Sequence, residues 1–212
     1  MKKYIHILGT VLIFISFTAC DPLIYLAKDG KEIMKTHKII AILPFHVDYD
    51  LKNGANIDLK TIHEQEKIDG YYVQKQAQGF LLFKMNTFSV EIQEINKTNS
   101  ILQKENISYD SLPSLDKTFL AKILGVDAIL YGDVHTNKVM SEGAAVAIDL
   151  LTNFWAPTNR IEVNATIHNG ADAKLLWQYN QVQKGGIAST SQGMTRNLMQ
   201  DIAYHFPYRN LK

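Results

Sequence analysis

Apolar residues in the middle of the chain change from a helical to an extended pattern at a glycine. Four of them lie on one face of a predicted short helix: Phe119, Leu120, Ile123 and Leu124. Ser114 is a suitable cap for its start, and Gly125 stands where helices commonly end in a left-handed residue. The next stretch, Val126–Val134, is apolar on both of its alternating sides. It is therefore predicted to be an inner strand covered on both faces.

The chain before this stretch predicts a strand, a loop and a long helix. Lys38–Phe45 forms a continuous apolar run that ends at Pro44, which cannot donate to a strand ladder. Val47–Lys60 shows little periodicity, so a loop is expected there. Apolar residues at helical spacing from Ile62 to Met85 predict a long helix laid on the sheet. Close packing is suggested by two glycines inside it, Gly70 and Gly79.

The remaining pattern predicts shorter elements around the central helix and a hairpin after it. Before the central helix come a half-exposed strand at Phe88–Gln93, a helix at Asn96–Glu105 and a loop at Ser108–Pro113. Two alternating runs flank the turn dipeptide Asn169-Gly170 and predict a hairpin: Ile161–His168 and Leu175–Tyr179. A last helix is capped by Ser189 or Thr190 and ends at Pro207.

An apolar segment, Val139–Asn159, interrupts the connection between the inner strand and the hairpin. Its apolar residues recur every three or four positions, as in a short amphipathic helix. It is shorter than the roughly 20 apolar residues that span a bilayer. It could pack into the core, dock on another subunit or lie in a membrane interface. Because long connections are usually functional or disordered, a contact surface is predicted, with four candidate residues: Ile148, Leu151, Phe154 and Trp155.

Residues 1–20 have the three regions of a secretory signal peptide. Lys2 and Lys3 precede an apolar run from Ile5 to Phe17, and small residues lead to Cys20. The last four residues, Phe17 to Cys20, resemble the bacterial lipobox, although Phe17 replaces the usual leucine. We therefore expect residues 1–20 to be a lipoprotein signal peptide and Cys20 to carry the lipid. The polar stretch 21–37 is then a tether, and residues 38–212 form one domain.

Composition narrows the possible partners. The 212 residues contain 22 basic and 21 acidic side chains, and removal of Lys2 and Lys3 leaves 20 against 21, a net charge of −1. A nearly balanced charge does not suggest a nucleic-acid partner. Cys20 is the single cysteine, so neither an internal disulfide nor a cysteine zinc site can form within one chain.

Candidate chemical groups are few. Two local histidine–carboxylate pairs, His46 with Asp48 and His135 with Asp133, match no metal-binding spacing and are interpreted as solvated or core-edge residues. Gly185-Gly186 ahead of the last helix lacks the Walker spacing and lysine, so a flexible connector is favoured. No catalytic residue, metal site or cofactor is predicted.

Three short runs carry a resemblance to a known group of proteins. They are IIAILPF at Ile39–Phe45, LAKILGVDAILYGDV at Leu120–Val134 and AKLLWQ at Ala173–Gln178. With them, the chain resembles bacterial lipoproteins of unknown function related to CsgG, LpoB and the TolB amino-terminal domain. The resemblance implies a single α/β domain with a mixed sheet packed by helices. It also implies an envelope binding or assembly module, and it supplies no catalytic residues.

These observations lead to one functional expectation and two alternatives. The chain is expected to be a non-enzymatic lipoprotein, held in the bacterial outer membrane facing the periplasm, that binds companion lipoproteins or copies of itself. An envelope hydrolase is the first alternative, and a deep polar pocket containing His46, Asp133 or His135 would favour it. A small-ligand carrier is the second, and a closed apolar cavity would support it.

Overall fold

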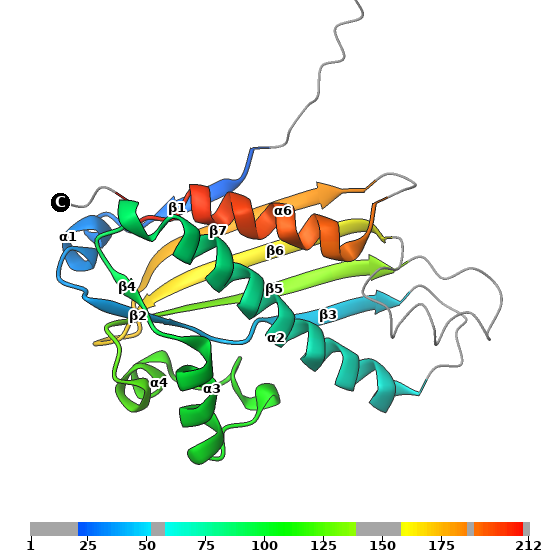
Figure 1. Ribbon diagram of the computed structural model, residues 1–212, viewed down its shortest axis with the longest axis horizontal. Coiled ribbons are helices and arrows are strands. Elements are labelled where there is room, and N and C mark those ends of the chain that lie inside the picture. The colour runs from blue at the N-terminus through cyan, green and yellow to red at the C-terminus, as the bar shows by residue number, and fades with distance from the viewer. Residues whose placement is uncertain (1–20, 52–57, 139–157, 186–188, 210–212) are drawn as a thin grey trace, which may run out of the picture.

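The computed structural model describes residues 21–51, 58–138, 158–185 and 189–209, and in them a mixed seven-stranded sheet carries helices on both faces (Figure 1). The strand order is β1-β7-β6-β5-β2-β4, and β3 pairs with β5 alongside β2. The strands are β1 Leu23–Leu26, β2 Ile39–Ile42, β3 His46–Leu51, β4 Glu91–Ile92, β5 Ala128–Lys138, β6 Thr158–Asn169 and β7 Leu175–Lys184. The α-helices in this part of the chain are α1 Gly30–Met34, α2 Leu59–Phe83, α3 Ile95–Lys104, α4 Lys117–Leu124 and α6 Ser191–Tyr204. The predicted α/β class is confirmed.

Strand β5 is the inner strand that the sequence predicts. It pairs in parallel with β2 and β3 on one side and antiparallel with β6 on the other. Leu130 and Val134 point into the larger core, under α2 and α6. Ile129 and Tyr131 point into a smaller core, under α3 and α4. Both faces of the strand are therefore covered, as its doubly apolar pattern requires.

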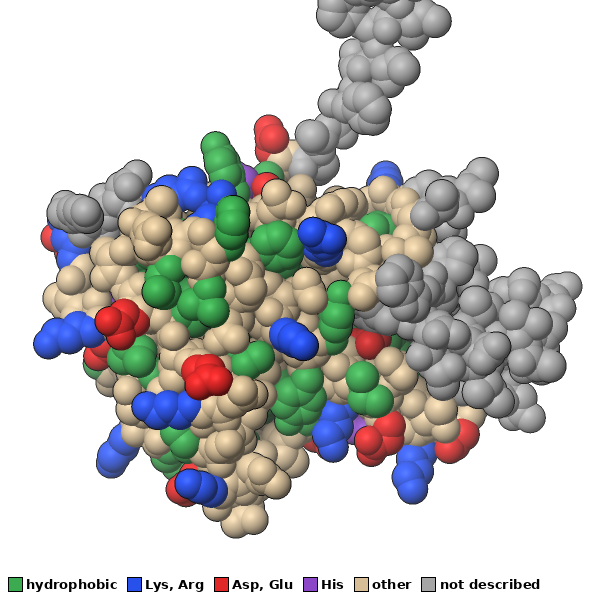
Figure 2. Space-filling model, viewed as in Figure 1, with side chains coloured by type: hydrophobic (Ala, Val, Ile, Leu, Met, Phe, Trp, Pro, Cys, Tyr) green, Lys and Arg blue, Asp and Glu red, His purple; other side chains and the backbone are tan. Residues whose placement is uncertain are grey.

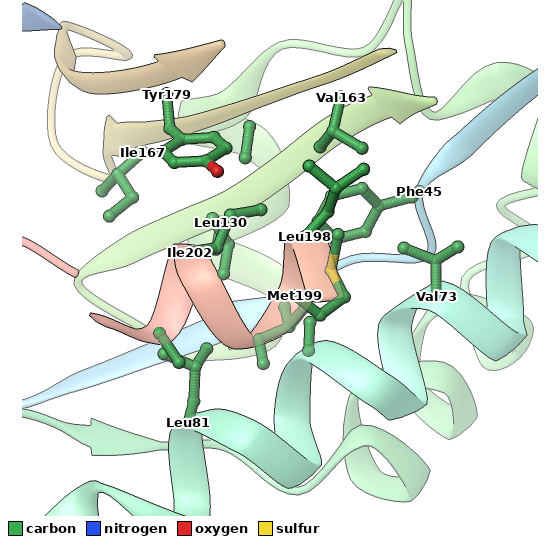
Figure 3. Packing of buried hydrophobic residues seen from close by; sticks show 14 of the residues in the cluster. Phe45, Val73, Leu81, Leu130, Val163, Ile167, Tyr179, Leu198, Met199 and Ile202 are labelled. Carbon is green, nitrogen blue, oxygen red and sulfur yellow. The ribbon is translucent and has the colours of Figure 1, made fainter. Parts of the chain in front are cut away.

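Helices α2 and α6 pack together on the larger core, where buried side chains from both helices meet the sheet (Figure 3). Leu198, Met199 and Ile202 of α6 are buried against residues of β5, β6 and β7. The predicted hairpin is β6 and β7, and Thr190 caps α6 by accepting a hydrogen bond from the Gly193 amide. The last helix and the hairpin are confirmed.

The ends of α4 show one correct and one wrong prediction. Asp116, not Ser114, caps the start, because its carboxylate accepts hydrogen bonds from the amides of Thr118 and Phe119. Gly125 ends the helix with φ 66° and ψ 44°, in the left-handed region. The predicted helix end is therefore confirmed, and the cap lies two residues later than expected.

The predicted loop at Val47–Lys60 is wrong at its start, where His46–Leu51 form strand β3. Val47 and Tyr49 are buried while Asp48 and Asp50 are exposed, so a short alternation was present in the sequence. Pro44 does interrupt the ladder that β2 and β3 each form with β5, as its missing N–H dictates. The hydroxyl of Tyr109 joins the two halves: it accepts from the Val47 amide at 2.9 Å and donates to the Phe45 carbonyl at 2.9 Å.

The predicted tether at residues 21–37 is also corrected. Leu23–Leu26 pair with β7 as an edge strand, and α1 follows at Gly30–Met34. The Ala27 amide donates to the Leu176 carbonyl at 2.9 Å, and the Met34 side chain is fully buried. The apolar run in β1 is only four residues long and precedes a polar turn, which is why the pattern alone did not reveal a strand.

The two glycines of α2 have opposite surroundings. A Cβ on Gly70 would collide with the Phe45 carbonyl and the Tyr109 ring, so close packing is confirmed there. A Cβ on Gly79 would meet nothing within 4 Å, so the predicted close packing is wrong at that position.

A Cβ at Gly79 or at Gly125 would meet nothing within 4 Å, but the two glycines differ in backbone conformation, so the same substitution should change stability in opposite directions. Gly125→Ala should lower the free energy of unfolding by about 1 kcal/mol, because an alanine is strained at positive φ. Gly79→Ala should raise it by about 0.5–1 kcal/mol, because alanine is the better helix former and meets no neighbour. Urea denaturation measures both, and an unchanged Gly125→Ala would contradict the strain assigned to this helix end.

Candidate functional site

A groove lies between α2 and α6 on the face shown in Figure 2, with a volume of about 680 Å³. Its apolar wall comes from Phe80 and Phe83 near the end of α2, and Gly79 leaves the wall open because it has no side chain. The first turn of α6 forms the opposite wall with Gln192 and Gly193. Two helices that pack on the same core thus leave an open hollow, with an apolar wall on the α2 side and small and polar residues on the α6 side.

The rim of this groove is cationic. Lys84 and Arg196 both line it, one from each side. Lys84 also lies 5.9 Å from the centre of the Tyr204 ring, and Arg209 lies 5.1 Å from the same ring. An apolar wall beside two cations suits an apolar group that carries a carboxylate or phosphate, or a segment of protein with apolar and acidic side chains.

The two predicted histidine–carboxylate pairs come together, but with exchanged partners. Parallel pairing of β3 with β5 sets His46 opposite Asp133 and Asp48 opposite His135. The His46 Nδ1 atom lies 3.5 Å from Asp133, and the His135 Nδ1 atom lies 3.2 Å from Asp48. The hydrogen bond to Asp133 raises the pKa of His46 above its ordinary value, although partial burial opposes it.

These four side chains form a partly exposed polar ladder on the sheet face away from α2 and α6. The groove between α2 and α6, a hollow beside Lys67 and Tyr71 and a hollow beside His37 and Asn169 are lined by residues other than His46, Asp133 and His135. Within the described part of the chain, no group of three or more His, Cys, Asp or Glu side chains is arranged to hold a metal ion. The four side chains are 35–55% exposed and do not enclose the deep polar pocket that would favour a hydrolase.

Glu66 on α2 connects that helix to the outer edge of β3. Its carboxylate accepts a hydrogen bond from the Tyr49 amide at 3.0 Å, and burial raises its pKa. His63, one turn earlier, lies 3.6 Å from Glu66 and 2.9 Å from Asp110. Asp69 accepts a hydrogen bond from the Tyr49 hydroxyl. These polar groups hold structural elements together, and each has a partner within the fold.

His37 and Asp127 have structural roles at the opposite end of the sheet. His37 is buried, with Nδ1 2.7 Å from the Tyr208 hydroxyl and Nε2 3.2 Å from the Asn169 side chain. Burial lowers the pKa of His37. The Asp127 carboxylate accepts from the amides of Lys38 and Ile39, at 2.7 and 3.0 Å. Asp127 therefore anchors the start of β2.

The residues predicted to carry function lie outside the described part of the chain. This holds for the lipid-accepting Cys20 and for the four candidate interface residues, Ile148, Leu151, Phe154 and Trp155. The connector Gly185-Gly186 lies only partly within it. Conversely, the sequence did not predict the groove, because the groove depends on how α2 and α6 are placed relative to each other and local sequence patterns do not determine that placement. The signal in the sequence that could have pointed to the groove is Gly79, a glycine within a predicted helix.

Comparison with known proteins reveals a resemblance in fold. No protein-family model matches the sequence, and no curated protein matches it either. Lipoprotein GNA1162 from Neisseria meningitidis is similar in structure at 12% identity and TM-score 0.49, over 79% of this chain and 94% of that one. A PelC dodecamer subunit from Paraburkholderia phytofirmans is similar at 8% identity and TM-score 0.43, over 89% of this chain and 98% of that one.

The C-terminal domain of LpoB from Salmonella enterica, a protein that the sequence motifs had suggested, is similar at 8% identity and TM-score 0.35, over 70% of this chain and 83% of that one. LpoB is thus named both by the resemblance of the sequence motifs and among the structures that are similar at low identity. Among the helices of the described residues, none is both long and apolar enough to cross a membrane.

The buried His37 predicts a loss of stability in mild acid. Its pKa lies below the ordinary value of 6.5. As the pH falls through 6.5, His37 therefore binds a proton more readily in the unfolded chain than in the folded one. The free energy of unfolding should therefore decrease as the pH falls below about 6.5. His37→Gln should lessen this decrease in urea denaturation at each pH.

His46 supplies a control of opposite sign. Because its pKa is raised, protonated His46 contributes stability below about 6.5 that is lost as the pH rises through its folded value. His46→Gln should therefore steepen the decrease in mild acid, by a small amount because the group is half-exposed. Equal pH slopes for His37→Gln and the unsubstituted protein would contradict the role of His37.

Proposed function

We propose that this chain is a lipid-anchored protein of the bacterial cell envelope that acts without catalysis, by binding other proteins. The observation that carries the proposal is the single cysteine at the end of a three-part signal peptide, where a lipobox ends. A diacylated and N-acylated Cys20 holds a protein stably at a membrane, since two or more chains are sufficient for lasting attachment.

The outer membrane, on its periplasmic side, is the proposed location. The signal peptide directs the chain out of the cytoplasm, and no cysteine other than Cys20 has to be kept reduced or paired there. The first strand begins at Leu23, so the folded domain starts almost at the anchor. Such a domain works within a short distance of the membrane surface.

Protein binding is the proposed activity, with companion lipoproteins or further copies of this chain as partners. The groove between α2 and α6 supports it, because it is an open hollow with an apolar wall and cationic rim. It is not the closed apolar cavity that a small-ligand carrier needs. The apolar segment 139–159, with Leu151 and Trp155, is the second proposed contact surface.

Cys20→Ala tests the anchor. The variant should lose the mass of the lipid and move from the membrane fraction to the soluble fraction, or persist as an uncleaved precursor. Mass spectrometry of the intact protein and fractionation of cell envelopes measure these changes. Unchanged mass together with unchanged membrane partition would refute lipid attachment at Cys20.

The paired substitution Leu151→Glu with Trp155→Glu tests the binding surface. Crosslinking in intact envelopes, followed by recovery of this chain, should yield less partner or less self-crosslinked product, at an unchanged melting temperature. Phe119→Glu, at an exposed position on α4, is the matched control and should leave recovery unchanged. Unfolding of the paired variant would instead assign the segment to the core and would contradict its proposed role as a contact surface.

A further inference from the structure

Strand β1 presents four consecutive apolar side chains to solvent at one edge of the sheet. Their exposed fractions are 76% for Leu23, 44% for Ile24, 49% for Tyr25 and 36% for Leu26. Successive side chains of a strand point to opposite faces, so β1 is apolar on both sides. Burial by the fold therefore does not account for this composition.

The sheet has β1 at one edge and β4 and β3 at the other, and the β1 and β3 edges differ in how their outer sides are covered. At the β3 edge, the Val47 amide donates a hydrogen bond to the Tyr109 hydroxyl, and the Tyr49 amide donates one to the Glu66 carboxylate. At the β1 edge, the described residues show ladder pairing with β7 on the inner side and no covering element on the outer side (Figure 1). Exposed apolar edge strands invite pairing or burial, and proteins usually protect them. The uncovered edge is thus a contact surface.

The position of β1 in the chain indicates what covers it. Leu23 follows Cys20 by three residues, which span at most about 10 Å when fully extended. The headgroup layer on each side of a bilayer is roughly 5–8 Å thick. With its lipid chains in the bilayer, Cys20 therefore places the start of β1 within or directly above the headgroups.

We propose that β1 lies in the membrane interface, so that this edge of the sheet rests on the bilayer and fixes the orientation of the domain. Leu23 and Ile24 contact the acyl boundary, and Tyr25 lies at headgroup level, where aromatic side chains with a polar tip are favoured. The proposal rests on lipid attachment at Cys20, and it adds a second, protein-made contact to that attachment.

Apart from the exposed Asp21, the charges next to β1 are compatible with an anionic lipid surface. The carboxylate of Asp29 is paired with Lys174 at 2.6 Å, and that of Glu32 is paired with Lys35 at 3.3 Å. Lys28 and Lys31 are exposed on the same short segment. Pairing of the acidic groups lessens repulsion from phosphate headgroups, and the exposed lysines attract them.

The test uses the lipidated full-length protein in vesicles of phosphatidylethanolamine and phosphatidylglycerol. Because a lipidated Cys20 is a thioether, Tyr25→Cys introduces the sole free thiol, which accepts an environment-sensitive fluorophore. The control label is Phe119→Cys on α4, with a similar exposed fraction of 44% but far from β1 (Figure 1). Nitroxide-bearing lipids then quench whichever label lies at the bilayer.

The label at position 25 should shift to shorter emission wavelength and lose most of its emission to the nitroxide lipids, while the label at 119 keeps its emission. A second label, Ile24→Cys on the other side of the strand, should behave like the first. Unquenched labels at 24 and 25 on protein that floats with the vesicles would overturn the membrane contact while leaving the anchor intact.

Two other outcomes distinguish the remaining explanations. Disulfide-linked dimers formed by the unlabelled Cys variants at position 24 or 25, together with unquenched labels in the labelled samples, would show that a second copy covers β1 and would overturn the proposal. Protein that does not float, and that carries a second label on a free Cys20 thiol, would refute the anchor itself. Melting temperatures of the labelled variants verify that the exposed substitutions leave the domain folded.

Discussion

The fold depends on one phenolic hydroxyl, that of Tyr109. Pro44 breaks the strand that runs beside β5, and the broken halves, β2 and β3, must nevertheless stay in register with it. The Tyr109 hydroxyl accepts from Val47 and donates to Phe45, so the backbone groups exposed by the break are satisfied at a buried position. An unsatisfied buried backbone group costs about 1–3 kcal/mol, and the same ring also contacts Gly70 of α2.

This arrangement connects layers that the sheet would otherwise separate. Tyr109 belongs to the turn between α3 and α4, on the side of the smaller core, while Gly70 and Glu66 belong to α2 on the larger one. Their meeting point closes the β3 edge with side chains rather than with another strand. Closure at one edge leaves the molecule with two distinct surfaces: the groove between α2 and α6, and the open edge at β1.

Sequence patterns correctly predicted elements in which apolar periodicity extends over many residues or in which glycine or turn residues mark the ends. The doubly apolar β5, the β6–β7 hairpin, α2 and the glycine at the end of α4 were all correct, because burial and positive φ impose recognisable residue types. Strands β1 and β3 were missed because each is short and borders polar residues. The exchanged pairing of His46 with Asp133 depends on strand register, and the groove depends on helix placement; neither is encoded locally.

The partner of β1 has a consequence for when the protein can fold. Leu23 pairs with Asn180, so the first strand needs β7, the last strand of the described residues, before its hydrogen bonds can form. Contacts this distant in sequence form slowly, because a long loop must close before they contribute stability. A chain exported from its N-terminus would thus remain unpaired at β1 until β7 had also crossed. In the proposed lipoprotein, Cys20 would thus receive its lipid while β1 is still unpaired, and the β1 edge would form only afterwards.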